Sequence, residues 1–308
     1  MTVTYPGSEE QRRDSASSPY DKNTVTQADS PHSLSPGEIV FLGTGTSHGV
    51  PVIGCRCPVC TSQDPRNRRT RCSLAVGLPE GTVLIDTPPE LRLQLVREGI
   101  ADLRAVLYTH AHADHLFGLD DLRVIPQYLK APVPVYCEAA VQARIRKAFD
   151  YAFEEGAPAG GVPQLEFITI DTEPFDLLGA RVIPLRLKHG PWDVLGFRFG
   201  KVAYCTDVKH FPEETLDRLR DLDVMILDCL RHEPHPTHLS VEEALAIIDL
   251  LRPRRCYLTH ICHRLDHATF SRELPPGVEP AYDGLRIQAE TMPPPCTADR
   301  LSLPSVEL

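Results

Sequence analysis

The sequence lacks the features that would place the protein in a membrane, outside the cell or on nucleic acid. No apolar run approaches the ~18 residues that a membrane helix requires, and the N-terminus has no charged-then-apolar signal pattern. Basic residues are scarce: 32 Lys and Arg against 42 Asp and Glu give a formal net charge of -10. A nonspecific nucleic-acid binder normally shows a basic face. We therefore expect a cytoplasmic protein that contacts no membrane and for which nucleic acid is not a partner.

Both ends of the chain lack a periodic apolar pattern. Residues 1–36 are rich in Ser, Thr, Asp, Gln and Pro, and the other end contains Pro293-Pro294-Pro295. Such segments cannot bury enough surface to offset chain entropy. The 308 residues are 42% hydrophobic, which is enough for one large α/β domain, although the length alone would allow two. We predict a disordered N-terminal extension over 1–36, a folded domain over 37–290 and a flexible tail over 291–308.

One short segment concentrates metal-ligand side chains. His110-Ala111-His112-Ala113-Asp114-His115 places three imidazoles and a carboxylate in six positions. Neutral imidazole and carboxylate hold Zn²⁺, Mn²⁺ or Fe²⁺, and alternating ligands let one loop serve two adjacent ions. The preceding residues 105–108 are typical of a short buried strand, and catalytic groups favour the loop that leaves a strand. The alternative is a histidine-rich surface loop without a ligand.

Three further strands are predicted to end in a ligand type. Residues 182–187 precede His189, residues 201–205 precede Asp207, and residues 256–258 precede His260. A single His or Asp after a strand is more often a turn residue or a satisfied polar group. The repetition of this context favours a shared metal centre.

These motifs together resemble the metallo-β-lactamase superfamily over roughly residues 38–290, which makes 37–290 one hydrolase domain. The resemblance implies two mixed sheets flanked by helices, with His110, His112 and His189 on one metal. It places Asp114, His115 and His260 on a second metal, with Asp207 bridging the two. Asp86, after the predicted strand 82–85, would support the ligand loop from behind, although a strand-terminal turn residue is an alternative.

A second cluster, Cys55-Arg56-Cys57-Pro58-Val59-Cys60, brings three thiols into six residues. Without a secretory signal, a structural tetrahedral Zn²⁺ fits these thiols better than disulfides, and such a site needs a fourth ligand. The cluster resembles that of the PhnP-type phosphodiesterases, which act on phosphoribosyl cyclic phosphates. This resemblance implies that His263 completes the zinc site and that a homodimer is possible. Cys262 is a rival fourth ligand, and three reduced thiols without a metal are the alternative.

Helical patterns alternate with the predicted strands, an order that by itself would also allow a doubly wound sheet. The last helix has Ser240 and Glu243 at the two positions of a capping box. The expected helices are Pro89–Glu98, Leu116–Lys130, Ala139–Glu155, Pro212–Arg220 and Val241–Leu251.

The implied cofactors are two divalent ions, Mn²⁺ or Zn²⁺, at the catalytic site and one structural Zn²⁺. Paired cations ~3.5 to 4 Å apart can lower the pKa of a bridging water to about 7, so we expect a metal-bridged hydroxide to attack phosphorus. The leaving group then needs a proton. The resemblance selects His238, just before the last helix, as general acid, with His235 and His232 as alternatives on the same loop. With Asp114 and Asp86, His238 completes the candidate catalytic residues.

We predict that the substrate is a small phosphorylated molecule, a cyclic phosphoribosyl-like or nucleotide diester. A tRNA 3′-processing endonuclease of the same superfamily is the nearest rival, but it usually adds a basic, glycine-rich arm, and residues 153–161 contain no Lys or Arg. A cofactor-biosynthesis accessory protein of the pyrroloquinoline quinone type also carries a cysteine cluster. Its relatives depart from the full ligand set that this chain retains. Thioester and β-lactam hydrolases remain possible on fold alone.

Overall fold

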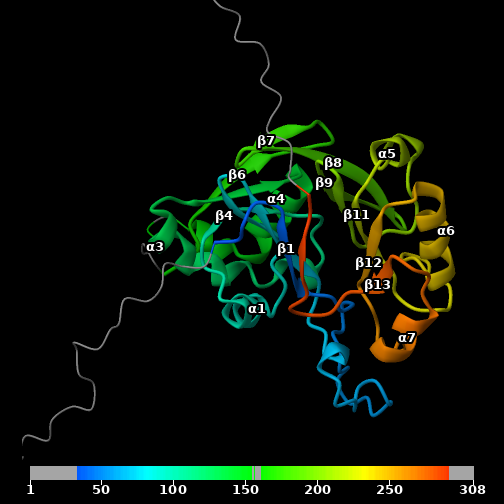
Figure 1. Cartoon of the computed structure of the whole chain (residues 1–308). Helices are drawn as coiled ribbons and strands as arrows, with labels where there is room; N and C mark the ends of the chain where they lie inside the picture. The colour runs from blue at the N-terminus through cyan, green and yellow to red at the C-terminus, as the bar shows by residue number, and fades with distance from the viewer. Residues whose placement is uncertain (1–32, 155, 157–160, 291–308) are drawn as a thin grey trace, which may run out of the picture. The chain divides into compact units, whose positions relative to one another are not determined.

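The computed structural model describes residues 33–154, 156 and 161–290 (Figure 1). Most of the predicted N-terminal extension and the whole predicted tail over 291–308 lie outside these residues. Leu34 precedes the predicted start of the domain, yet it is buried and its N–H donates to Thr82 Oγ1 at 3.2 Å. The packed part of the chain therefore includes residues before position 37. No helix in the described part combines the length and apolar character needed to cross a membrane.

The first sheet has seven strands, antiparallel at one end and parallel at the other. In spatial order they are β14 (Arg286–Gln288), β1 (Glu38–Gly43), β2 (Ser73–Leu78), β3 (Gly81–Ile85), β4 (Leu103–Leu107), β5 (Val133–Cys137) and β6 (Leu165–Thr169).

The second sheet repeats this plan, with parallel pairing from β10 to β13 and antiparallel pairing from β7 to β10. Its spatial order is β13 (Val278–Pro280), β12 (Arg255–Thr259), β11 (Val224–Asp228), β10 (Val202–Cys205), β9 (Trp192–Phe199), β8 (Ala180–His189) and β7 (Phe175–Leu177).

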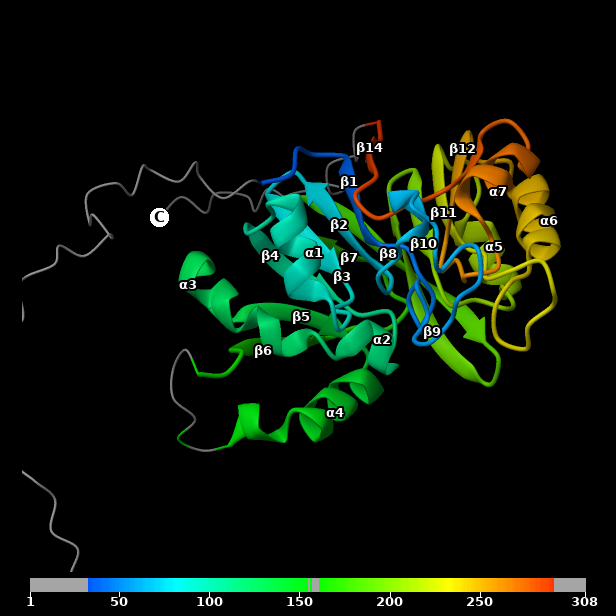
Figure 2. The same ribbon diagram turned by 90° about the horizontal axis from the view of Figure 1, so that it is seen from below.

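Helices cover the outer face of each sheet. Figures 1 and 2 show α6 and α7 beside the second sheet, away from α1 and α4, which lie beside the first. One apolar cluster, with Phe41, Phe197 and Tyr204, lies between the sheets, and separate clusters lie under each set of helices. The predicted fold class, two mixed sheets flanked by helices, is therefore confirmed. The α-helices are α1 (Leu91–Glu98), α2 (Ala113–Leu116), α3 (Ile125–Leu129), α4 (Ala139–Ala148), α5 (Glu213–Arg218), α6 (Val241–Leu251) and α7 (His267–Glu273), and 3₁₀ helices span Pro65–Asn67, Leu119–Val124 and Asp150–Phe153.

Two long helices predicted from the sequence are interrupted. The expected helix over 116–130 is divided into the end of α2, a 3₁₀ helix and α3. Gly118 packs so closely that a Cβ there would lie 2.0 Å from the carbonyl oxygen of Pro88, and Pro126 stands in the first turn of α3. Proline is tolerated in a first turn but breaks a helix interior, so a new helix begins here. The expected helix over 139–155 ends with α4 at Ala148, because Phe149 leaves the helical conformation and buries its ring.

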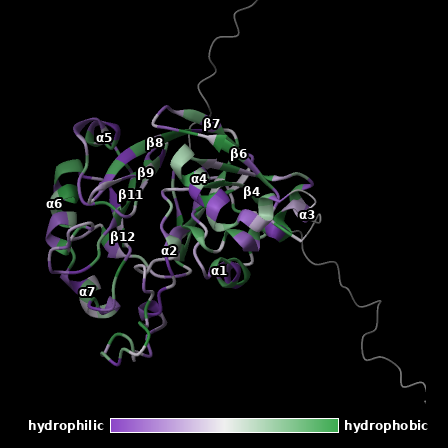
Figure 3. Cartoon of the chain, turned by 180° about the vertical axis from the view of Figure 1, so that it is seen from behind, coloured by the Kyte–Doolittle hydropathy of each residue, from purple (hydrophilic) through white to green (hydrophobic). Residues whose placement is uncertain are grey.

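Helix α6 has the predicted bounds. The Ser240 hydroxyl accepts from the backbone N–H of Glu243, and the Glu243 carboxylate accepts from the backbone N–H of Ser240, so the capping box is complete. Figure 3 shows both hydrophilic and hydrophobic colour on α6, as expected for a helix with one face against the sheet. This helix fixes the loop 231–240 that precedes it.

Candidate metal centre

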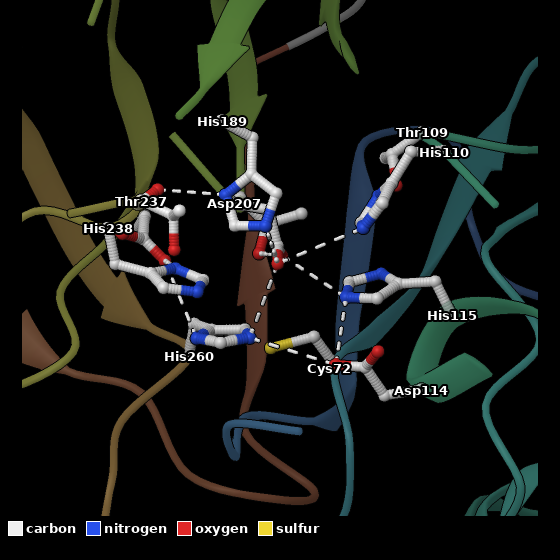
Figure 4. Close-up of polar contacts among 12 residues, drawn as sticks. Cys72, Thr109, His110, Asp114, His115, His189, Asp207, Thr237, His238 and His260 are labelled. Atoms are coloured by element: carbon white, nitrogen blue, oxygen red, sulfur yellow. Dashed lines mark hydrogen bonds and ion pairs between the residues drawn. The ribbon is translucent and has the colours of Figure 1, made fainter. Parts of the chain in front are cut away.

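All seven predicted ligands of the dinuclear centre come together at the edge where strands of both sheets end. Figure 4 labels all of them except His112. The carboxyl ends of parallel strands meet at one edge of a sheet. The loop after β4 in the first sheet and the loops after β10 and β12 in the second sheet therefore lie at this edge, where β8 also ends. The residues are His110, His112, Asp114 and His115 after β4, His189 at the end of β8, Asp207 after β10 and His260 after β12.

These side chains form two neighbouring groups, the grouping that the family resemblance implies. The first group is His110, His112 and His189. The second group is Asp114, His115, Asp207 and His260. Within each group the candidate ligand atoms all lie within 4.8 Å of one another. Each group is therefore compact enough for one cation.

Asp207 lies between the two groups. Its Oδ1 is 3.9 Å from Nε2 of His110 and 3.8 Å from Nε2 of His189, both in the first group. On the other side, Oδ2 is 3.1 Å from Nε2 of His115, and Oδ1 is 3.5 Å from Nε2 of His260. One carboxylate thus faces both groups, which is the position that a bridging ligand would occupy.

The predicted supporting residue, Asp86, is fully buried behind the ligand loop. Its Oδ1 accepts the backbone N–H of Thr109 at 2.8 Å, and its Oδ2 accepts the Thr109 hydroxyl at 2.7 Å and Nδ1–H of His115 at 2.7 Å. Donation from Nδ1 leaves Nε2 of His115 free to face Asp207. Asp86, Asp207 and His260 all have φ between 52° and 62°, a left-handed conformation that is costly outside glycine and that clusters at functional sites.

Two further contacts orient rings from the second sheet. Nδ1–H of His189 donates to the carbonyl oxygen of Thr237 at 2.8 Å, so its Nε2 faces the centre. Nδ1–H of His238 donates to Oδ1 of Asp228 at 3.1 Å, and Oδ2 of Asp228 accepts the backbone N–H of Leu239 at 2.9 Å. Asp228 therefore holds His238 and its loop in place.

The electrostatics of the centre favour a bound cation. Burial alone would raise the pKa of Asp207, but the imidazoles of His260 and His115 hold it well below its ordinary value. Burial would lower the pKa of His115, but the carboxylates of Asp207, Asp114 and Asp86 raise it well above its ordinary value. These carboxylates concentrate negative charge in a buried site. A divalent cation would neutralise that charge.

Buried imidazole nitrogens without hydrogen-bond partners among the described residues also indicate a site for divalent cations. Burial lowers the pKa of His110 well below its ordinary value, so the ring is neutral. Nε2 of His110 and Nε2 of His260 are buried, and neither has a hydrogen-bond partner among the described residues. A buried polar atom without a partner costs about 1–3 kcal/mol, whereas a neutral imidazole nitrogen is a good ligand for Zn²⁺ or Mn²⁺. The donor set therefore fits two divalent ions.

The three thiols of the cysteine cluster gather around His263, as predicted for a zinc site. Nδ1 of His263 lies 3.3 Å from Sγ of Cys55, 3.5 Å from Sγ of Cys57 and 3.4 Å from Sγ of Cys60. A tetrahedral Zn²⁺ with bonds of about 2.3 Å to sulfur and 2.0 Å to nitrogen requires S and N to lie about 3.5 Å apart. The rival fourth ligand, Cys262, does not belong to this group.

We predict that Cys57→Ser removes about one Zn²⁺ per chain and lowers the melting temperature, because a structural zinc contributes directly to folding free energy. A loss of only ~2 kcal/mol would lower the melting temperature of a domain of this size by roughly 4–8 °C. Elemental analysis and calorimetry measure the two effects. Cys262→Ser is the matched control and should keep the full zinc content. Unchanged zinc in Cys57→Ser would show that this thiol is not a ligand.

A cavity of about 520 Å³ opens beside the centre and is lined by His112, His189 and His238 among others. A ring nitrogen of His238 lies within 4.8 Å of His189 and Asp207 ligand atoms. Burial would lower the pKa of His238, but the Asp228 carboxylate that accepts its Nδ1 proton raises this pKa to about 9. The ring is therefore protonated at neutral pH. His235 also lines the cavity. Among the described residues, His232 is not part of the cavity lining; it is half exposed, and its Nε2 lies 3.5 Å from Oε2 of Glu273.

Sequence reasoning missed Asp228 and Trp192. Asp228 ends β11 in the same context as the predicted ligands, so the rule that found Asp207 and His260 could have found it. Trp192 begins β9 and carries no ligand atom, so no motif indicated it.

Comparison with known proteins supports the fold and shows the family. Residues 81–261 match the family model described as a beta-lactamase superfamily domain. A solved structure described as a new diphosphatase from the PhnP family superposes with a TM-score of 0.78 at 41% identity, covering 83% of this chain and 98% of that chain.

Two relatives carry other names. A protein of Porphyromonas gingivalis named octanoyltransferase is 38% identical over 253 residues, which are 80% of this chain and 50% of that protein. Coenzyme PQQ synthesis protein B of Methylobacterium radiotolerans is 39% identical over 99 residues, 28% of this chain and 33% of that protein. The chain thus spans half or less of the length of these relatives. From the family model and the PhnP-family structure, it belongs to the metallo-β-lactamase superfamily and, within it, to the PhnP family.

Proposed function

We propose that this protein is a dinuclear metal-dependent phosphodiesterase that hydrolyses a small cyclic phosphodiester of the phosphoribosyl or nucleotide type. The observation that carries the proposal is the pair of ligand groups around Asp207 beside a cavity lined by His238, whose Nδ1 is held by Asp228. When bound, two divalent cations would supply a nucleophile at neutral pH and neutralise the charge that develops on phosphorus.

The residues of the chain divide the remaining work. His110, His112 and His189 would hold one cation and Asp114, His115 and His260 the other, with Asp207 shared between them. Asp86 fixes the ring of His115, and the Thr237 carbonyl fixes the ring of His189, so their ligand atoms are aimed before substrate arrives.

Departure of an alkoxide requires a proton at the leaving oxygen. His238 is held by Asp228, is protonated at neutral pH and faces the cavity, so it can donate that proton. After the transfer, the Asp228 carboxylate keeps the neutral ring in its Nδ1–H form. This pairing suits a diester with a poor leaving group.

The similarity to a PhnP-family diphosphatase at 41% identity supports phosphorus as the reacting centre. The relative named octanoyltransferase would instead suggest an acyl substrate. That support is weaker, because the chain covers only 50% of that protein. A tRNA substrate has less support, because residues 153–161 contain no Lys or Arg and the chain is acidic overall.

A substrate panel tests the proposal on the protein loaded with Mn²⁺ or Zn²⁺. The panel contains ribose 1,2-cyclic 5-phosphate, a 2′,3′-cyclic nucleotide, a precursor tRNA, a β-lactam and an acyl thioester. We expect turnover of at least one cyclic diester, with kcat/KM well above that for the other classes. Preference for the tRNA, the lactam or the thioester would contradict the proposal.

A further inference from the structure

Trp192 occupies an unusual position for a tryptophan, half exposed at the rim of the candidate metal centre. It is the only Trp in the chain and is 51% exposed. Trp192 pairs directly with His189 across a tight hairpin between β8 and β9, and their ring centroids lie 5.8 Å apart. On the other side, its ring meets His112 edge to face at 5.1 Å. The indole thus contacts two candidate ligands and keeps half of its surface open.

The hairpin fixes this position. Gly190 has φ of 62°, and a Cβ there would lie 2.6 Å from Cγ2 of Thr237, so the turn is pressed against the loop that carries His238. A left-handed residue without a side chain is needed at this contact. Trp192 follows the turn directly, so the hairpin sets the position of its backbone beside the centre.

Trp192 also lines two cavities. It lines the cavity of about 520 Å³ beside the centre, and with His112 it lines a second cavity of about 340 Å³. The first cavity also has apolar lining from Val52 and Leu230. Its volume falls within the range of about 300–1,000 Å³ that is typical of sites for complete small-molecule ligands. A phosphodiester group bound at the metals would therefore leave room in the cavity beside Trp192 for the rest of the substrate.

We propose that Trp192 is the stacking platform for a nucleobase, so that the substrate is a nucleotide diester rather than a base-free sugar phosphate. This inference rests on the proposed function, because it needs the phosphodiester to bind at the adjacent metal centre. An exposed indole face offers a planar π surface, and every nucleobase can stack on such a surface.

The competing explanation is that Trp192 only shields His112 and His189 from water. Shielding would act on the metal ligands and would affect every substrate alike. Stacking would act on binding of the base and would leave base-free substrates unaffected. The two explanations therefore differ in substrate dependence and in a direct optical signal.

Intrinsic fluorescence gives that signal, because all tryptophan emission comes from Trp192. Adenosine 5′-monophosphate should quench the emission of the metal-loaded protein saturably, and ribose 5-phosphate should not, with free indole as the control for absorbed light. Equal quenching by both compounds, or none by the nucleotide, would overturn the proposal.

Kinetics on variants give a second readout. Trp192→Ala should raise KM for a 2′,3′-cyclic nucleotide by roughly 5- to 150-fold, the loss expected for one stacked base, with little change in kcat. KM for ribose 1,2-cyclic 5-phosphate should not change. Trp192→Phe should restore most of the binding. Tyr128→Ala, which alters a similarly exposed aromatic ring lining a different cavity, is the matched control.

Equal losses on both substrates, or a fall in kcat with unchanged KM, would assign Trp192 to shielding. Failure of this inference and failure of the proposed function can be told apart. Turnover of cyclic diesters without selective quenching removes only the stacking role. Selective quenching by the nucleotide without any diester turnover removes the proposed reaction and keeps the nucleobase site.

Discussion

Asp207→Asn is expected to abolish hydrolysis while leaving the fold nearly intact. Among the residues that the structure describes, Asp207 is the carboxylate that faces both ligand groups, and the amide removes the negative charge that two cations would share. We expect kcat/KM to fall by more than roughly 10³-fold, equivalent to about 4 kcal/mol of transition-state stabilisation. Asparagine has nearly the same volume, so the circular dichroism spectrum should be unchanged. Steady-state kinetics and elemental analysis of the same preparation measure the effect.

Asp176→Asn is the matched control, because Asp176 is exposed and pairs with Arg181 on the surface. This variant should retain full activity. His110→Ala should cause a similar loss of activity, because it removes a ligand of the first group and the proposed reaction needs a cation in each group. Near-normal turnover in either ligand variant would remove the metal centre from the mechanism.

The candidate ligands could be predicted to come together because they follow strands. Each strand expected before Asp86, His110, Asp207 and His260 is present, and a strand end fixes the direction in which the next side chain leaves the sheet. Periodicity and one short motif thus indicated these residues as candidate ligands, and the family resemblance assigned them to two groups.

Residues that act through another side chain were harder to identify. The position of Asp228 at the end of a strand could mark it as a candidate, but its role as the partner of His238 could not be predicted. No spacing relation links the two residues, because their contact depends on how the loop 229–240 folds back. The prediction of one continuous helix over 116–130 was wrong for a related reason. Its break depends on the close approach of Gly118 to Pro88, a tertiary contact that is absent from any local pattern.

The short helix α7 was also missed. Its start is marked by Asp266, which accepts the backbone N–H of Thr269 at 3.0 Å, but seven residues carry too little periodicity to stand out. This helix lies directly after the loop with His263, so the cysteine site and the second sheet meet there.

His238→Ala is expected to slow hydrolysis of a cyclic sugar phosphate diester by roughly 10² to 10⁴, the usual range for general acid catalysis. His238 is 6% exposed, held by Asp228 and raised in pKa to about 9, so the folded protein keeps a proton at the cavity wall. A p-nitrophenyl diester should lose less activity, because its phenolate leaves without a proton. Rates on both substrates, with metal content measured in parallel, give the comparison.

His232→Ala is the control for this experiment. His232 lies on the same loop but is half exposed and near Glu273, so its loss should leave both rates unchanged. Equal losses on both substrates in His238→Ala, with full metal content, would refute the general-acid role and indicate that the ring positions the phosphate. No loss on either substrate would move the role to His235, which lines the same cavity. Loss of a metal ligand is expected to slow hydrolysis of both substrates equally. The ratio of the two rate losses therefore separates proton donation from metal binding.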